Sequence, residues 1–172
     1  MKTLVLGLGN PILSDDGVGI HVARELKGRL DQQGVTVMET SLAGLGLLDL
    51  LVGYDRAIII DAIQNREAKA GQIYRLEPRA FDDTYCASTP HDVNFATALE
   101  MGNKLGLSLP QKIVIFAIQV EDVTTFSEMC TPKVAQVIPT VADMVIQELN
   151  GRRNARAFYR SNHPKNSVSR TC

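Results

Sequence analysis

The sequence has no tryptophan, few aromatic residues and no long apolar run. Phe, Trp and Tyr make up only 5% of the 172 residues. No apolar stretch approaches the roughly 18 residues that a helix needs to cross a bilayer, so we expect no membrane attachment. The N-terminal run MKTLVLGLGN leads into Pro11 and not into a small-residue cleavage site, which favours a buried first strand over a secretory signal. These absences predict a cytoplasmic protein with one globular domain over residues 1–150.

Cysteine is scarce as well. Cys86, Cys130 and Cys172 are odd in number and lie far apart in the chain. This pattern argues against a disulfide framework and against a Cys-x-x-Cys metal site. We therefore predict three free thiols.

Acidic residues are missing from the end of the chain. Residues 151–172 contain six Lys or Arg residues and no Asp or Glu, which leaves 12 basic and 19 acidic residues in the first 150. A basic tail can bind nucleic acid or an acidic partner. Its Asn, Ser, Pro and Arg content and its few apolar residues are more typical of disorder, and disorder is our prediction for 151–172.

The apolar residues that are present alternate between strand-like runs and helix-like stripes. Strands are expected at 3–8, 35–38, 57–63, 72–76 and 112–119, and helices at 18–30, 42–52, 88–104 and 131–149. Asp15 and Asp16 stand where they could cap the first of these helices, and Pro139 should kink the last. The alternation predicts an α/β three-layer sandwich with a mainly parallel five-stranded sheet covered by helices on both faces. The 72–76 strand is a candidate for an antiparallel edge.

Asp61 is the residue that most clearly points to a site. Its neighbours in AIIIDAI mark a central strand, where an ionised carboxylate is costly unless it is paired or bound to a cation. Ligands of parallel sheets gather at the carboxyl ends of the strands, where Asp61 should lie. The alternative is a structural carboxylate that accepts hydrogen bonds from neighbouring backbone.

Two further candidates complete a set of ligand types. Asp16 follows the first strand, and His91 follows Ser88-Thr89-Pro90 at the predicted start of a helix. Divalent nickel and zinc accept this combination of carboxylate and imidazole donors. A lone histidine in such a position is more commonly a surface or capping residue, and the spacing alone does not bring these side chains together. His21 and His163 are predicted to have no role in a site.

The loop Gly7-Leu8-Gly9-Asn10-Pro11-Ile12 invites comparison with a dinucleotide-binding turn. Its pattern is G-x-G-x-x-Ile, so the third glycine of that turn is missing. Asp15 and Asp16 would also repel a pyrophosphate. Although Glu39 could imitate a ribose-binding acid, the loop argues against a nucleotide cofactor.

Four segments together resemble the hydrogenase maturation endopeptidases. They are GLGNPILSDDGVG, IIIDAI, STPHDVNFATAL and IQVEDVTTFSEMCTPKVAQVIP. The resemblance extends from about Lys2 to Asn150, and the first of these segments is long and specific.

The resemblance implies a metal site and a reaction. Family members process the large subunit of NiFe hydrogenases, and their metal ligands correspond here to Asp16, Asp61 and His91. The family often has Glu at the first of these positions, so Asp15 is a possible substitute for Asp16. Glu39 is a less certain match to a second functional acid, and either Asp16 or Glu39 is a candidate general base of an aspartic-type peptidase.

The implied partner is a large-subunit precursor that already carries nickel. The enzyme recognises this nickel and removes the precursor's C-terminal extension, so the metal is supplied by the substrate and is absent from the free enzyme or weakly bound there. Whether nickel also takes part in catalysis is left open.

Two rival functions remain. Peptidyl-tRNA hydrolases also open with GLGNP, but the continuation here, ILSDD, lacks their catalytic histidine, and an acidic domain suits nucleic acid poorly. The second rival is a nickel-dependent chaperone or docking module that does not cleave its partner. It stays open because no single residue in the sequence is diagnostic of peptide cleavage.

Overall fold

The computed structural model describes residues 1–31, 33–65, 68–80 and 95–151, and every structural statement below concerns these residues. His91, Cys86, Cys172 and the tail from residue 152 lie outside them. Among the helices described, none combines the length and the apolar character that crossing a bilayer requires.

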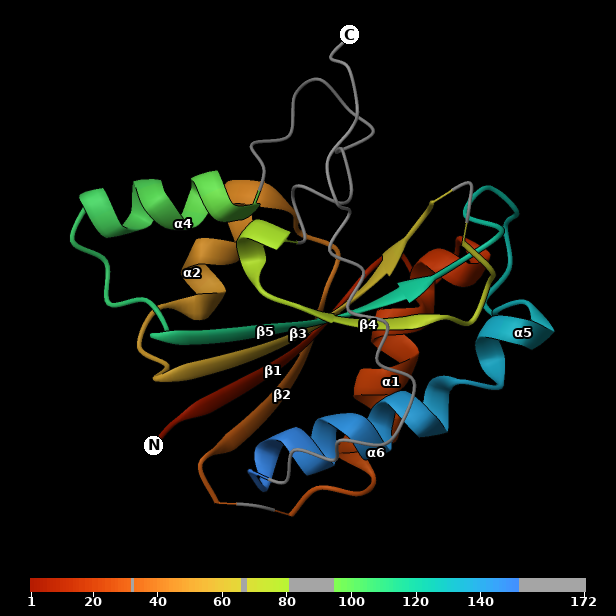
Figure 1. The fold of residues 1–172 in the computed structure, drawn as a ribbon, viewed down its shortest axis with the longest axis horizontal. Coiled ribbons are helices and arrows are strands. Elements are labelled where there is room, and N and C mark those ends of the chain that lie inside the picture. The colour runs from red at the N-terminus through yellow and green to blue at the C-terminus, as the bar shows by residue number, and fades with distance from the viewer. Residues whose placement is uncertain (32, 66–67, 81–94, 152–172) are drawn as a thin grey trace, which may run out of the picture.

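The described chain forms a five-stranded sheet in the order β2-β1-β3-β5-β4 (Figure 1). The strands are β1 (Thr3–Leu8), β2 (Val35–Thr40), β3 (Arg56–Ile63), β4 (Ile73–Leu76) and β5 (Lys112–Gln119). All strands except β4 are parallel to one another. β4 pairs with β5 at the edge of the sheet in antiparallel orientation. This confirms the predicted sheet, including its antiparallel edge, and it gathers the carboxyl ends of β1, β2, β3 and β5 at one end.

Helices cover both faces of the sheet (Figure 1). On one side lie α1 (Val18–Lys27) and α6 (Ile138–Leu149), and on the other α2 (Leu48–Leu51) and α4 (Phe95–Lys104). Side chains alternate along the central strand β3, so Ile58 and Ile60 pack under α1 and α6, and Ala57, Ile59 and Ile63 pack under α2 and α4. The predicted three-layer α/β fold is confirmed.

Two of the predicted helices differ from the structure. The stretch 42–52 forms a 3-10 helix at Gly44–Leu47 and the single turn of α2, because Gly44 begins it with a positive φ of 54° and Ala43 is extended. The prediction that Pro139 kinks one long helix is also wrong. The chain instead forms α5 (Pro132–Ala135) and then α6, with Pro139 in the first turn of α6, where its missing N–H costs nothing. The end of α4 at Lys104 is as predicted, and the expected start near Ser88 lies outside the described residues.

An ion cluster fastens the end of α6 to the amino ends of β3 and β5 and to β4. The Glu148 carboxylate accepts hydrogen bonds from Arg75 at 3.0 Å, from Lys112 at 3.2 Å and from Arg56, whose side chain is also buried. Burial alone would raise the pKa of Glu148, but the bonds to Arg75 and Lys112 outweigh it and hold this pKa below its ordinary value.

We expect Glu148→Gln to lower the free energy of unfolding by about 2–4 kcal/mol, because it leaves the buried Arg56 guanidinium without its counter-charge. The depressed pKa gives the pH dependence its sign: the contribution of Glu148 is present above its unfolded pKa and is lost as pH falls through the lower folded value. Urea unfolding at several pH values measures both effects. Glu25→Gln, which breaks only the exposed pair with Arg29, is the matched control and should cost under about 0.5 kcal/mol. Equal losses in the two variants would contradict this reading.

Candidate functional site

Asp61 lies near the carboxyl end of β3, as its place in the sequence predicts. It continues the series of Ala57 and Ile59, so it belongs to the face of the sheet that α2 and α4 cover. Its Oδ1 accepts a 2.8 Å hydrogen bond from the Ala62 N–H, and its Oδ2 has no hydrogen bond within the described residues.

The surroundings of Asp61 disfavour its ionised form. Burial raises the pKa of Asp61 to about 7, the Ala62 N–H opposes this rise, and the negative charge of Asp16 adds to it. The structure therefore brings Asp16 and Asp61 near enough for the two charges to interact. A cation between them would relieve both the burial cost and the repulsion.

Asp16 comes from the 3-10 turn Ser14–Gly17 that links β1 to α1. Its Oδ2 accepts a 2.8 Å hydrogen bond from the Asn10 N–H, which fixes the carboxylate against the loop. The other oxygen makes no hydrogen bond to a described residue, so within the described part of the chain each of the two aspartates has one oxygen without a hydrogen bond. This donor set suits a divalent cation.

The third predicted ligand, His91, lies outside the described residues, as do its neighbours over residues 81–94. Within residues 1–31, 33–65, 68–80 and 95–151, no three His, Cys, Asp or Glu side chains gather in a metal-binding group. Asp16 and Asp61 thus form the described part of the candidate site, and the role of His91 stays a prediction.

Glu39 lies near the end of β2 but belongs to the other face of the sheet. Its carboxylate accepts hydrogen bonds from Lys27 at 2.7 Å and from Arg24 at 3.0 Å, both on α1. The bond to Lys27 lowers the pKa of Glu39, burial opposes that change, and Arg24 adds to the lowering. A carboxylate held in two ion pairs on the α1 side is poorly placed to act as a base beside Asp61.

Asp15 has a structural role that the sequence did not reveal. The prediction that it caps α1, and the suggestion that it replaces Asp16, do not hold, because its fully buried carboxylate bonds elsewhere. It accepts hydrogen bonds from the backbone N–H groups of Glu121, Asp122 and Thr131 and from the Thr131 hydroxyl, at 2.7 to 3.2 Å. Asp15 therefore fastens the loop that carries Asp16 to the loop between β5 and α5.

Asp15→Asn should lower the free energy of unfolding by about 2–4 kcal/mol, because an amide NH₂ group replaces one of the oxygens that receive these buried N–H groups. Chemical denaturation measures the loss. Asp31→Asn, at an exposed position, is the control and should change stability by less than about 0.5 kcal/mol. A similarly small effect of Asp15→Asn would show that the hydrogen bonds between the two loops contribute little to stability.

A hollow of about 800 Å³ lies beside the ends of β3 and β5. Its lining includes Asn65, Gln119 and the ion pair between Lys133 and Glu121. Neither Asp16 nor Asp61 belongs to that lining, so the hollow is separate from the candidate site.

Comparison with known proteins decides the family. The family model described as hydrogenase maturation protease matches residues 20–148, about three quarters of the chain. The chain belongs to this family. It is thus a member of a peptidase family, and the family resemblance seen in the sequence is confirmed.

Several hydrogenase maturation proteases and related proteins are similar over most of their length. The hydrogenase 2 maturation protease of Escherichia coli is 26% identical over 151 residues, which cover 87% of this chain and 91% of that protein. The hydrogenase expression/formation protein HupD of Bradyrhizobium diazoefficiens is 28% identical over 159 residues, covering 86% and 78%. Among solved structures, the hydrogenase maturating endopeptidase HybD from E. coli has a TM-score of 0.76 and 25% identity, covering 89% of this chain and 94% of HybD.

Two glycines set how closely α1 approaches the sheet in this chain. A Cβ on Gly19 would lie 2.4 Å from the carbonyl oxygens of both Ile60 and Leu8, and one on Gly7 would lie 2.2 Å from the Gly19 oxygen. The close contact that a third glycine makes in a dinucleotide-binding turn is thus supplied here by Gly19, ten residues after Gly9. Because Asp16 lies only two residues before the start of this helix, the contact also sets the distance between Asp16 and β3.

Proposed function

We propose that this chain removes the C-terminal extension of a NiFe hydrogenase large-subunit precursor after that precursor has received nickel. The observation that carries the proposal is the pair of interacting carboxylates, Asp16 and Asp61, at the carboxyl ends of parallel strands in a chain of the maturation protease family. The names of the relatives, hydrogenase maturation proteases, support the same substrate.

In this proposal the nickel belongs to the substrate, and the two aspartates recognise it. Asp61 holds a proton up to a pH of about 7 when no cation is bound, so nickel binding displaces that proton. A precursor without nickel offers no such compensation for the two charges and binds more weakly. His91 is proposed as the nitrogen ligand, and Phe95, four residues later, is buried in the core on the same face of the sheet as Asp61.

Between the two candidate bases, the structure favours Asp16 over Glu39. Asp16 keeps an oxygen with no hydrogen bond to a described residue beside Asp61, whereas Glu39 is bound by Arg24 and Lys27 on the other face. The aspartic-type assignment rests on Asp16, which accepts a proton from the attacking water and can return it to the leaving amine, while Asp61 has given up its own proton to hold the nickel of the substrate.

The decisive experiment is mass spectrometry of a nickel-loaded large-subunit precursor before and after incubation with this protein. We expect loss of one C-terminal peptide, and no loss from the same precursor prepared without nickel. Stable binding of the nickel-loaded precursor without any cleavage would instead identify a docking module. Cleavage that is independent of nickel would exclude the recognition step.

A further inference from the structure

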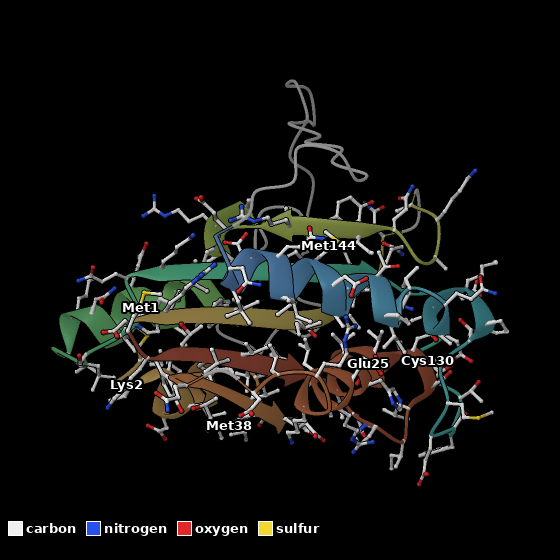
Figure 2. All side chains as sticks on the ribbon, turned by 90° about the horizontal axis from the view of Figure 1, so that it is seen from below. Met1, Lys2, Glu25, Met38, Cys130 and Met144 are labelled. Atoms are coloured by element: carbon white, nitrogen blue, oxygen red, sulfur yellow. The ribbon has the colours of Figure 1, made fainter. Side chains whose placement is uncertain are left out.

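Large apolar side chains are exposed in three loops at the site end of the sheet. We call these residues the apolar rim: Ile12, Leu42, Leu45, Phe126 and Met129. Phe126 and Met129 are 81% and 76% exposed. Figure 2 shows this end of the sheet at Cys130, the residue after Met129, and the opposite end at Met1 and Lys2. Exposed apolar groups that gather beside a site commonly mark a contact with a partner.

Hydrogen bonds join the three loops to one another. The Ser41 hydroxyl donates to the Gly9 carbonyl at 2.9 Å, which links the loop after β2 to the loop after β1. The Ser14 N–H donates to the Ser127 carbonyl at 2.8 Å, which links the loop after β1 to the loop after β5. The three loops that carry the rim are therefore bonded to one another, and one of them also carries Asp16.

The loop that carries Phe126 and Met129 is internally bonded as well. The Asp122 carboxylate accepts hydrogen bonds from the N–H groups of Thr124 and Thr125, both at 3.0 Å. The Ser127 hydroxyl donates to the Met129 carbonyl, and the Met129 N–H donates back to the Ser127 oxygen. These bonds hold the backbone in a conformation that presents both apolar side chains to solvent.

Negative charge lies beside Phe126 and Met129 in the rim. Asp122 and Glu128 lie in the same loop as Phe126, and no Lys or Arg among the described residues forms an ion pair with either. The pKa of Asp122 is lowered to about 2, chiefly by its hydrogen bonds to Thr125, so this carboxylate is charged at neutral pH. With 12 basic and 19 acidic residues, the first 150 residues are acidic as a whole. A partner that fits here combines apolar side chains with positive charge.

We infer that the apolar rim docks the C-terminal segment of the large-subunit precursor, through apolar side chains of that segment flanked by Lys or Arg. The inference rests on the proposed function, because it takes the precursor as the occupant. Asp16 lies in one of the loops that form the rim, so a peptide docked on the rim lies beside the candidate site. Apolar burial supplies affinity there, and the acidic groups select a basic segment.

The test compares two double variants of the full chain. Phe126→Ser with Met129→Ser removes the most exposed part of the rim. Leu105→Ser with Met101→Ser removes exposed apolar groups from α4 and its end, away from the rim, where Leu105 is 74% exposed. Binding to the nickel-loaded precursor and the kinetics of its cleavage are measured for both, with thermal melts and light scattering.

We expect the rim variant to weaken precursor binding about tenfold or more, as loss of apolar anchors does at interfaces, and to raise KM more than it lowers kcat. The control variant should stay within about twofold of the wild type. Added salt should weaken binding of the wild type, because the acidic groups are exposed. Melts of both variants should match the wild type.

The outcomes separate this inference from the proposed function. If the wild type binds the precursor through the rim but never cleaves it, docking stands and the peptidase proposal fails. If the wild type cleaves and the rim variant binds and cleaves equally well, the docking inference is overturned. It is overturned too if the wild type does not bind the precursor, or if light scattering shows a wild-type dimer that the rim variant cannot form.

Discussion

Asp61→Asn is expected to reduce cleavage of the nickel-loaded precursor by about 100-fold or more while leaving the fold intact. The substitution preserves the shape of the side chain and can keep the hydrogen bond from the Ala62 N–H to its oxygen. It removes the charge that a cation would bind and the proton that Asp61 would exchange.

His91→Ala should also abolish cleavage if His91 supplies the nitrogen ligand. Asp16→Glu should remain active, because the family resemblance allows Glu at that position.

Asp61→Asn should raise the free energy of unfolding even though it lowers the rate of cleavage. The pKa of Asp61 is about 7 in the folded protein against 3.8 for an unperturbed aspartate, so the folded state binds this proton more tightly than the unfolded state. The resulting stability is fully present below the unfolded pKa and is lost as pH rises through about 7. Asp61→Asn lacks this loss, so its free energy of unfolding should exceed that of the wild type by on the order of 2–4 kcal/mol at pH 8.

Denaturation curves across the pH range test that sign. The wild type and Asp61→Asn should have similar stability near pH 4 and diverge as pH rises, whereas Asp31→Asn, an exposed control, should track the wild type throughout. Full cleavage by Asp61→Asn would remove Asp61 from the proposed site. Loss of cleavage together with a collapse of the melt would show that the residue is structural.

The sheet was predictable because its strands are short apolar runs with clear ends. The structure has β1 at Thr3–Leu8 and β5 at Lys112–Gln119, as the sequence analysis predicted. The place of Asp61 near the carboxyl end of a central strand was predictable for the same reason, because apolar residues flank it on both sides. Its role in a site stays a prediction. The bounds of the short helices were harder to predict. Gly44 and Pro139 change the local backbone conformation, and the spacing of apolar residues does not show where one helix ends and the next begins.

The two loop acids could not be told apart from the sequence. Asp15 and Asp16 are adjacent and of one residue type, yet Asp15 is enclosed by backbone donors from residues more than 100 positions away. Glu39 posed a similar problem, because its ion pairs with Arg24 and Lys27 depend on how α1 packs against β2. Contacts of this kind depend on which elements meet in space. Glu39 and Asp61 lie on opposite faces of the sheet. This could be assigned only once the register of the strands was known.

Nothing in the sequence distinguishes Gly19 from the glycines that precede it in the loop, yet its replacement should have the largest effect on stability. In Gly19→Ala the added Cβ would lie 2.4 Å from the Leu8 and Ile60 carbonyl oxygens and 2.9 Å from the Leu8 nitrogen. These are backbone atoms of adjacent strands in the middle of the sheet, so no flexible side chain can move aside. The helix itself must shift outward from β1 and β3.

We therefore expect Gly19→Ala to lower the free energy of unfolding by about 3 kcal/mol or more, at or beyond the upper end of the range for overpacked cores. Gly28→Ala is the matched control, at the other end of α1. Gly28 has a φ of −75°, and its added Cβ would meet only the Glu25 oxygen at 3.6 Å, so that variant should be neutral or up to about 1 kcal/mol more stable. Urea unfolding distinguishes the two, and an unfolding midpoint of Gly19→Ala within error of the wild type would refute the close-contact reading. Any Gly19→Ala protein that still folds should cleave precursor poorly, because an outward shift of α1 carries Asp16 away from Asp61.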